Sequence, residues 1–126
     1  MFGLFKKTPK LESTFTSTTA VARELAKEIE VVGELVVRNV GKDAEFADVE
    51  VILVAGGTRR IDLALPKELS GTVRIAAGST LKVPCNWKIK LAAPMRAPHC
   101  EVQLQTHTGD KIAPLCHSNK FDLDNV

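Results

Sequence analysis

The sequence predicts an all-β fold, an antiparallel β-sandwich. The strongest observation is the segment Leu81–Leu91, in which every odd position is apolar and every even position is polar or proline. A period of two held over eleven residues is typical of a strand with one buried face. Turn-forming Gly, Pro, Asn and Asp residues recur between short alternating segments, and only one segment has a helical pattern. We therefore expect seven or eight short strands joined by tight turns.

The N-terminal quarter contains the one helical candidate. Leu11–Ser17 alternates weakly and is expected to form a strand at a sheet edge. For Thr18–Glu28 we expect at most one short helix, because the segment is rich in Ala, Glu and Leu and because Thr18 or Thr19 could cap it. The alternative is an irregular loop that leads into the next strand. The apolar residues that recur there at intervals of four are Val21, Leu25 and Ile29.

From residue 29 onward the pattern is that of strands. The first inward row is expected to consist of Ile29, Val31, Leu35 and Val37, and the next of Ala47, Val49, Val51, Leu53 and Ala55. Gly56-Gly57 indicates a hairpin turn before Ile61–Leu65, and Val73–Ile75 is a short strand. After Leu81–Leu91, a strand is expected from Cys100 to Thr106 and a last one from Ile112 to His117.

Composition limits the classes of function. The chain has 126 residues and 44% hydrophobic residues, enough for one core without metal or disulfides. We expect a tail over residues 1–10 and one sandwich domain over 11–126. Without the three lysines of that tail, the domain has 14 basic residues (17 less three) and 15 acidic ones. This balance does not suggest that the domain binds nucleic acid. Three cysteines, an odd number, and the lack of a secretory pattern favour the cytoplasm.

The last third of the chain resembles the arrestin-like proteins of the bacterial sporulation-control family. The residues that carry the resemblance are Val83-Pro84, Pro94, Leu104-Gln105-Thr106 and Asp122-Leu123-Asp124, joined by Gly33–Val37 in the first half. This chain departs from the family pattern in having His107-Thr108-Gly109 after the Gln-Thr pair and room for one sandwich instead of two. The resemblance implies an immunoglobulin or arrestin-like sandwich and a regulatory or protein-binding role without catalytic residues.

Cysteine and histidine residues form the first candidate site. The pairs His99-Cys100 and Cys116-His117 could contribute ligands to a metal, or to a redox-responsive site. However, neighbouring residues on a strand point to opposite faces, and no C-x-x-C or H-x-x-x-H spacing is present. We therefore expect Cys85 and Cys100 to be small core residues, and a disulfide between them to be disfavoured in a reducing cytosol. We expect no cofactor and no enzymatic activity.

Two surface features are candidates for binding. The outward row of the Leu81–Leu91 strand carries Lys82, Lys88 and Lys90, which could meet an acidic partner or could keep a sheet face soluble and an edge unpaired. The N-terminal tail could dock on a partner or make weak contact with a membrane surface, through Phe2, Leu4, Phe5, Lys6 and Lys7.

The sequence thus predicts a non-catalytic cytoplasmic interaction or regulatory module. Its expected partners are proteins that pair with a strand edge or cover an outer face, and the edges of an open sandwich also allow a homo-oligomer. Few aromatic residues are present to stack on bases, so nucleic acid is not an expected partner. The alternatives are a small metal-binding or redox-responsive protein and a peripheral membrane or scaffold protein recruited by its tail.

Overall fold

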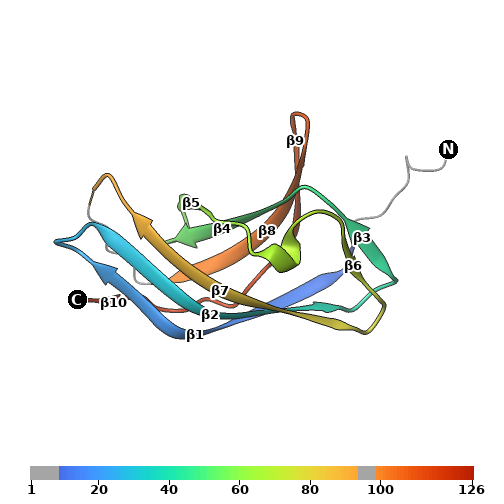
Figure 1. Cartoon of the computed structure of the whole chain (residues 1–126), viewed down its shortest axis with the longest axis horizontal. Helices are drawn as coiled ribbons and strands as arrows, with labels where there is room; N and C mark the ends of the chain where they lie inside the picture. The colour runs from blue at the N-terminus through green and yellow to red at the C-terminus, as the bar shows by residue number, and fades with distance from the viewer. Residues whose placement is uncertain (1–8, 94–98) are drawn as a thin grey trace.

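The computed structural model describes residues 9–93 and 99–126 and confirms the all-β fold. Two four-stranded sheets pack face to face, and a two-stranded sheet lies at one end (Figure 1). The long sheet has the order β10-β1-β2-β7 and the short sheet the order β5-β4-β8-β9. All strand pairs are antiparallel except β1 with β10. The strands are β1 (Leu11–Arg23), β2 (Glu28–Asn39), β3 (Ala44–Phe46), β4 (Val49–Ala55), β5 (Arg59–Leu63), β6 (Val73–Ile75), β7 (Thr80–Lys90), β8 (Cys100–Thr108), β9 (Lys111–His117) and β10 (Asp124–Asn125).

The alternating rows read from the sequence form the core. In β2 the four predicted inward residues are fully buried, and in β7 the odd residues Val83, Cys85 and Trp87 are buried while the even ones are exposed. In the described part of the chain, β3 and β10 are two strands that the sequence did not predict. Ala47 is exposed, contrary to expectation, because Asp48 has a φ of 57° and turns the chain between β3 and β4.

The expected helix at Thr18–Glu28 is wrong. This segment is the second half of β1, a turn, and the first residue of β2. The register of β1 on β2 shifts between Ser17 and Thr19, which is a β-bulge. The bulge moves the inward side chains from odd to even positions, so Phe15 and Ala22 are both buried. Because the inward row changes from odd to even positions within β1, the apolar residues of this segment do not alternate along its whole length. The intervals of four between Val21, Leu25 and Ile29 therefore resemble a helical pattern.

Gly33 faces this bulge from β2. A methyl group added at Gly33 would collide with the backbone oxygen of Thr16 and come within 2.8 Å of Ser17 Cα and 2.9 Å of the Phe15 ring. The Phe15 ring also packs against Phe121, with ring centres 4.9 Å apart, and against Trp87 at 6.1 Å. The bulge therefore depends on glycine at this position, and an aromatic cluster covers it.

A buried asparagine holds the other end of β2. The Asn39 side chain donates to the backbone oxygens of Lys42 (2.7 Å) and Ile75 (2.8 Å) and accepts from the Gly41 N–H (2.9 Å). It is fully buried. These three bonds join the turn after β2 to the end of β6. They provide hydrogen-bond partners for the backbone oxygens of Lys42 and Ile75 and for the Gly41 N–H.

Candidate functional site: an open strand edge

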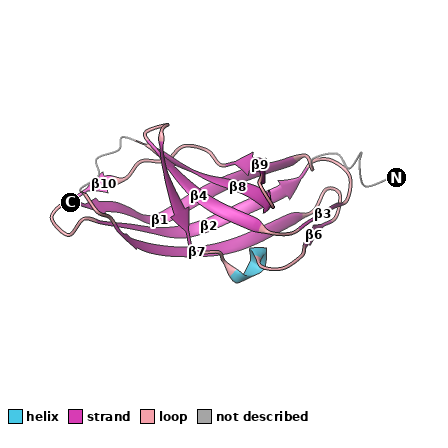
Figure 2. Ribbon diagram, turned by 90° about the horizontal axis from the view of Figure 1, so that it is seen from above, coloured by secondary structure: helices cyan, strands magenta, loops and turns pink. Residues whose placement is uncertain are grey.

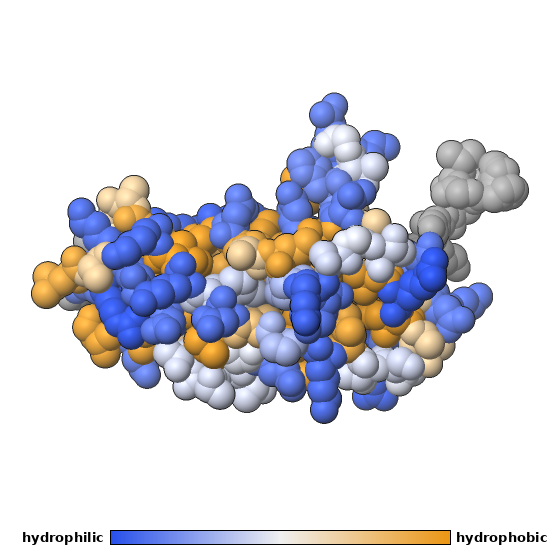
Figure 3. All heavy atoms as spheres, in the orientation of Figure 1, coloured by the Kyte–Doolittle hydropathy of each residue, from blue (hydrophilic) through white to orange (hydrophobic). Residues whose placement is uncertain are grey.

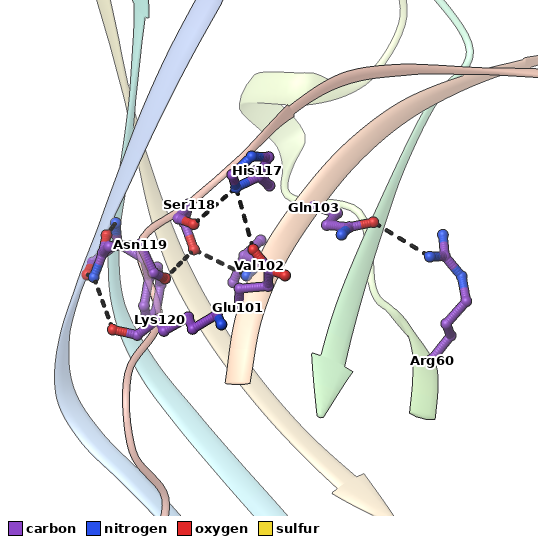
Figure 4. Close-up of polar contacts among 9 residues, drawn as sticks. Arg60, Glu101, Val102, Gln103, His117, Ser118, Asn119 and Lys120 are labelled. Atoms are coloured by element: carbon purple, nitrogen blue, oxygen red, sulfur yellow. Dashed lines mark hydrogen bonds and ion pairs between the residues drawn. The ribbon is translucent and has the colours of Figure 1, made fainter. Parts of the chain in front are cut away.

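The C-terminal segment closes one side of the sandwich. After β9, the Ser118 N–H donates to Val102 O (2.8 Å) and the Val102 N–H donates to Ser118 Oγ (2.9 Å) (Figure 4). Three residues further along this segment, Phe121 and Cys100 exchange backbone hydrogen bonds of 2.8 and 2.7 Å. The segment after β9 therefore stays hydrogen-bonded to the first residues of β8 while it crosses from the short sheet to the long sheet.

The same segment covers the outer edge of β1. The Phe15 N–H donates to Asn119 Oδ1 (2.8 Å), and Asn119 Nδ2 donates back to Phe15 O (3.2 Å). The amide side chain thus replaces one residue of a paired strand. Further along, β10 pairs with Val21 and Ala22, and the Val126 N–H donates to Ala22 O (3.0 Å). This edge of the long sheet is occupied by the chain itself.

The opposite edge of the long sheet is β7, and no further strand of the described residues pairs with it. The Leu91 N–H donates to Lys27 O (2.7 Å) and the Asn39 N–H to Ser79 O (3.0 Å), so odd-numbered residues of β7 face β2 with their backbone groups. The even-numbered residues consequently turn theirs outward. Pro84, which has no N–H to offer, has this outward phase, as expected for proline in an edge strand. In Figure 2, β7 forms the margin of the molecule on this side.

Only part of this edge is accessible. The 3-10 helix η2 (Lys67–Leu69) lies beside the middle of β7 (Figure 2), with Leu69 buried. Trp87 Nε1 donates to Ala64 O (2.8 Å), which fixes the same loop against β7. Within the part of the chain that the structure describes, no residue forms a backbone hydrogen bond with the outward groups of Asn86–Lys90. We call this stretch the β7 edge.

The predicted lysines of β7 are exposed and lie on the outer face of the long sheet. Lys88 Nζ and Lys90 Nζ are 3.8 and 3.5 Å from the carboxylate of Glu28, and their side chains are 63% and 75% exposed. Arg23 also contacts Glu28 (3.3 Å). One nearly buried carboxylate, with its side chain 10% exposed, is therefore shared by three partly exposed cations. Lys82 is exposed at the other half of β7.

The outer face of the short sheet is a second polar surface, but its side chains bind one another. Arg60 donates to Gln103 (3.3 Å) and Gln105 (3.0 Å), and Gln105 Nε2 donates to Glu50 (2.9 Å). His107 Nδ1 lies 3.2 Å from the same carboxylate. The hydrogen bonds of Gln105 and His107 lower the pKa of Glu50 from its ordinary value. Figure 4 shows Arg60 reaching across to Gln103.

This network has a structural role. Ile52 and Val54 point toward the outer face of β4, yet they are 4% and 5% exposed. Both strand neighbours of each carry polar residues: Asp62 and Gln103 beside Ile52, Arg60 and Glu101 beside Val54. Their aliphatic parts account for the burial of two apolar residues on an outer face. The polar side chains of this surface therefore cover Ile52 and Val54 and bind one another, which makes the surface a weaker candidate for binding a partner.

The Cys and His candidates are dispersed. Cys100 is buried and His117 is exposed, with its Nδ1 3.2 Å from Glu101. His99 is half-buried, and its backbone oxygen accepts from Gly56. Cys116 is half-buried, and its side chain interacts with Ser13. Among the described residues, no three His, Cys, Asp or Glu side chains are placed to hold a metal ion.

Burial also disfavours the thiolate form of the three cysteines. Burial raises the pKa of Cys85 and of Cys100 to about 11, and burial raises the pKa of Cys116 as well. All three cysteines are free. Because the thiolate is the form that attacks electrophiles and binds metals, these shifts oppose both roles near neutral pH.

The N-terminal candidates Phe2, Leu4, Phe5, Lys6 and Lys7 lie outside the described residues. Within residues 9–93 and 99–126, no helix has the length and apolar character needed to cross a membrane.

Sequence reasoning identified β7 and its lysines but missed what makes β7 the open edge. The opposite edge of the long sheet, along β1, is occupied by Asn119 and β10. The parity of Pro84 was the available signal, since a proline inside an alternating strand indicates an edge. Asn119 carries no local signal, because its partner Phe15 is 104 residues away.

No protein-family model matches the chain, and no curated protein matches it in sequence. Among solved structures, the chain is similar to the Pseudomonas fluorescens alkylpurine DNA glycosylase AlkC bound to DNA containing an abasic site analog. The TM-score is 0.47 and the identity 11%, and the match covers 92% of this chain but only 31% of the glycosylase. Northeast Structural Genomics Consortium target SoR45, an X-ray structure, gives a TM-score of 0.49 and 10% identity over 93% of this chain and 86% of that one. Similarities this distant carry no argument about function.

Proposed function

We propose that this protein is a non-catalytic protein-interaction module of the cytoplasm, with an arrestin-like sandwich, and that it binds a partner strand along the β7 edge. The observation that carries the proposal is the row of outward backbone donors and acceptors at Asn86, Lys88 and Lys90. An extended segment of another protein can pair with such an edge, and its main-chain hydrogen bonds then supply affinity.

The protection of the other edges supports this choice. The β1 edge is covered by Asn119 and β10. In the short sheet, β5 has only five residues, and β9 contains Pro114 and a register shift where it pairs with Leu104 and Gln105. Short strands, prolines and bulges are the usual means of preventing strand addition. The β7 edge lies in an eleven-residue strand and, beyond Pro84, has neither a proline nor a register shift.

The alternatives have less support. An enzyme or a metal protein would need reactive or converging side chains, whereas the thiols are buried with raised pKa values and the His residues lie apart. The free, protonated thiols are in agreement with a reducing compartment.

The test is a capture experiment from native lysate with wild type, Lys88→Pro and Lys88→Ala. Like Pro84, residue 88 is even-numbered and turns its N–H away from β2. Proline at position 88 therefore removes one outward N–H and leaves the hydrogen bonds between β2 and β7 intact. Alanine removes the charge but keeps the N–H. We expect a captured protein to be retained by Lys88→Ala and lost with Lys88→Pro, and Asn86→Pro to act in the same way.

Thermal melting of each variant verifies that the fold is kept. If the same proteins bind wild type and both folded proline variants in equal amounts, the β7 edge is not the binding site and the proposal fails.

A further inference from the structure

We infer that the β7 edge selects an extended segment in which acidic and apolar residues alternate. The inference rests on the proposed function and specifies the chemistry of the partner. In strand addition, side chains of the incoming strand lie beside those of the edge strand, on alternating faces. Alternate residues of the partner strand would therefore lie beside the outer and the inner face of β7, and the chemistry of each face determines which residue types fit there.

The outer face of β7 offers only positive charge. At the β7 edge its outward side chains are Asn86, Lys88 and Lys90, all exposed, with Lys82 further along. The carboxylate that Lys88 and Lys90 approach belongs to Glu28, one strand further into the sheet. An added strand would meet the lysines from their other side. Each acidic residue placed directly opposite a lysine would favour the pairing.

The inner face offers apolar surface that the protein itself does not fully bury. Ile89 and Leu91 of the β7 region and Ile61 of β5 pack against the core but remain partly exposed. In Figure 3, hydrophobic atoms are visible in the band between the two sheets, with hydrophilic atoms on either side. Apolar residues of an added strand would complete the burial of this band.

The chain contains an internal precedent on the other edge of the same sheet. In the segment Phe121–Asp124, apolar and acidic residues alternate; Leu123 is 4% exposed while Asp122 and Asp124 are exposed. The end of this segment pairs with β1 as β10. Where this segment reaches the long sheet, it thus has Leu123 inward and the paired Asp124 outward, while Phe121 bridges to Cys100 of β8.

A second copy of this chain fits the β7 edge poorly. In an antiparallel pair of β7 strands centred on Asn86, Lys82 of one copy would stand opposite Lys90 of the other. Like charges directly opposite each other destabilise a strand pair. The lysines therefore reject self-pairing and admit an acidic segment.

The probe is a fluorescein-labelled peptide in which Glu alternates with Val or Ile, compared with the same peptide carrying Lys for Glu. Binding is followed by fluorescence anisotropy at about 50 mM and about 500 mM salt. We expect the acidic peptide to bind at least about tenfold more tightly than the basic one at low salt, and to weaken at high salt. Lys88→Gln should weaken it about threefold and Lys88→Pro about tenfold. Lys111→Gln, at the tip of the exposed β8–β9 hairpin (Figure 1), is the control and should change nothing.

Equal affinity for the two peptides, or acidic-peptide binding that survives Lys88→Pro, would overturn the inference. So would a wild-type dimer in sedimentation that Lys88→Pro abolishes, because a second copy would then be the occupant. If a lysate protein needs the β7 edge but the acidic peptide does not bind, the inference fails and the proposed function stands.

Discussion

The Asn119 side chain explains why one edge of the long sheet is closed, and its removal tests that explanation. In Asn119→Ala, the N–H and C=O of Phe15 lose their hydrogen bonds of 2.8 and 3.2 Å. A typical hydrogen bond contributes about 1 kcal/mol net. Because both bonds are partly buried, we expect the free energy of unfolding to fall by about 2 kcal/mol.

That free energy converts into a measurable shift. With an unfolding entropy of about 2.1 cal/mol/K per residue, the 126-residue chain loses about 4 °C in Tm for each kcal/mol, so Tm should fall by about 8 °C. Asn119→Asp keeps the acceptor for the Phe15 N–H but turns the donor into a carboxylate oxygen facing Phe15 O. It should destabilise the protein at least as much as alanine does. The assay is calorimetry, with denaturant unfolding as a second probe.

Asn125→Ala is the matched control, because Asn125 lies in the same segment, is exposed and pairs with β1 through its backbone. It should shift Tm by no more than about 2 °C. Opening the β1 edge should also promote self-association of Asn119→Ala in size-exclusion chromatography. A Tm for Asn119→Ala within about 2 °C of wild type, without self-association, would refute the reasoning.

Three further predictions concern the core. Asn39→Ala breaks three side-chain hydrogen bonds and should cost about 3 kcal/mol, about 11 °C in Tm by calorimetry; an effect no larger than that of the exposed Asn86→Ala would contradict it. Gly33→Ala forces a methyl group onto the Thr16 backbone and should cost about 3 kcal/mol or more in denaturant unfolding; a neutral result would show that the bulge can move. Burial raises the pKa of Cys85 and Cys100 from 9.0 to about 11, so folded thiols keep protons that unfolded ones lose, and stability should be full below pH 9 and fall as pH rises toward 11. Urea unfolding should show a slope of about 1.4 kcal/mol per pH unit for each thiol, and Cys100→Ala should reduce it; an unchanged slope would contradict the assignment.

The sequence predicted the strands well only where apolar and polar residues alternate along the chain. Where apolar residues alternated without interruption, as in β2 and β7, the strands and their buried faces were predicted correctly. The Thr18–Glu28 helix failed because the bulge in β1 changes the parity of the inward row, and that bulge is fixed by contact with Gly33 of the next strand. β10 was missed because its two residues have too little pattern to detect, and β3 because its inward residues Ala44 and Phe46 are even-numbered and out of phase with the odd row of β4.

The candidate site shows the same division. The sequence by itself determined that Lys82, Lys88 and Lys90 share the polar face of a strand, since a period of two fixes that relation within the strand. Whether this strand lies inside a sheet or at its margin depends on which distant segments pair with it. Only the tertiary structure decided that Asn119 and β10 occupy the β1 side, and that no strand of the described residues pairs with the outer side of β7. The physical reason is that backbone hydrogen bonds between strands join residues far apart in the chain, and each edge is defined by the partner that it lacks.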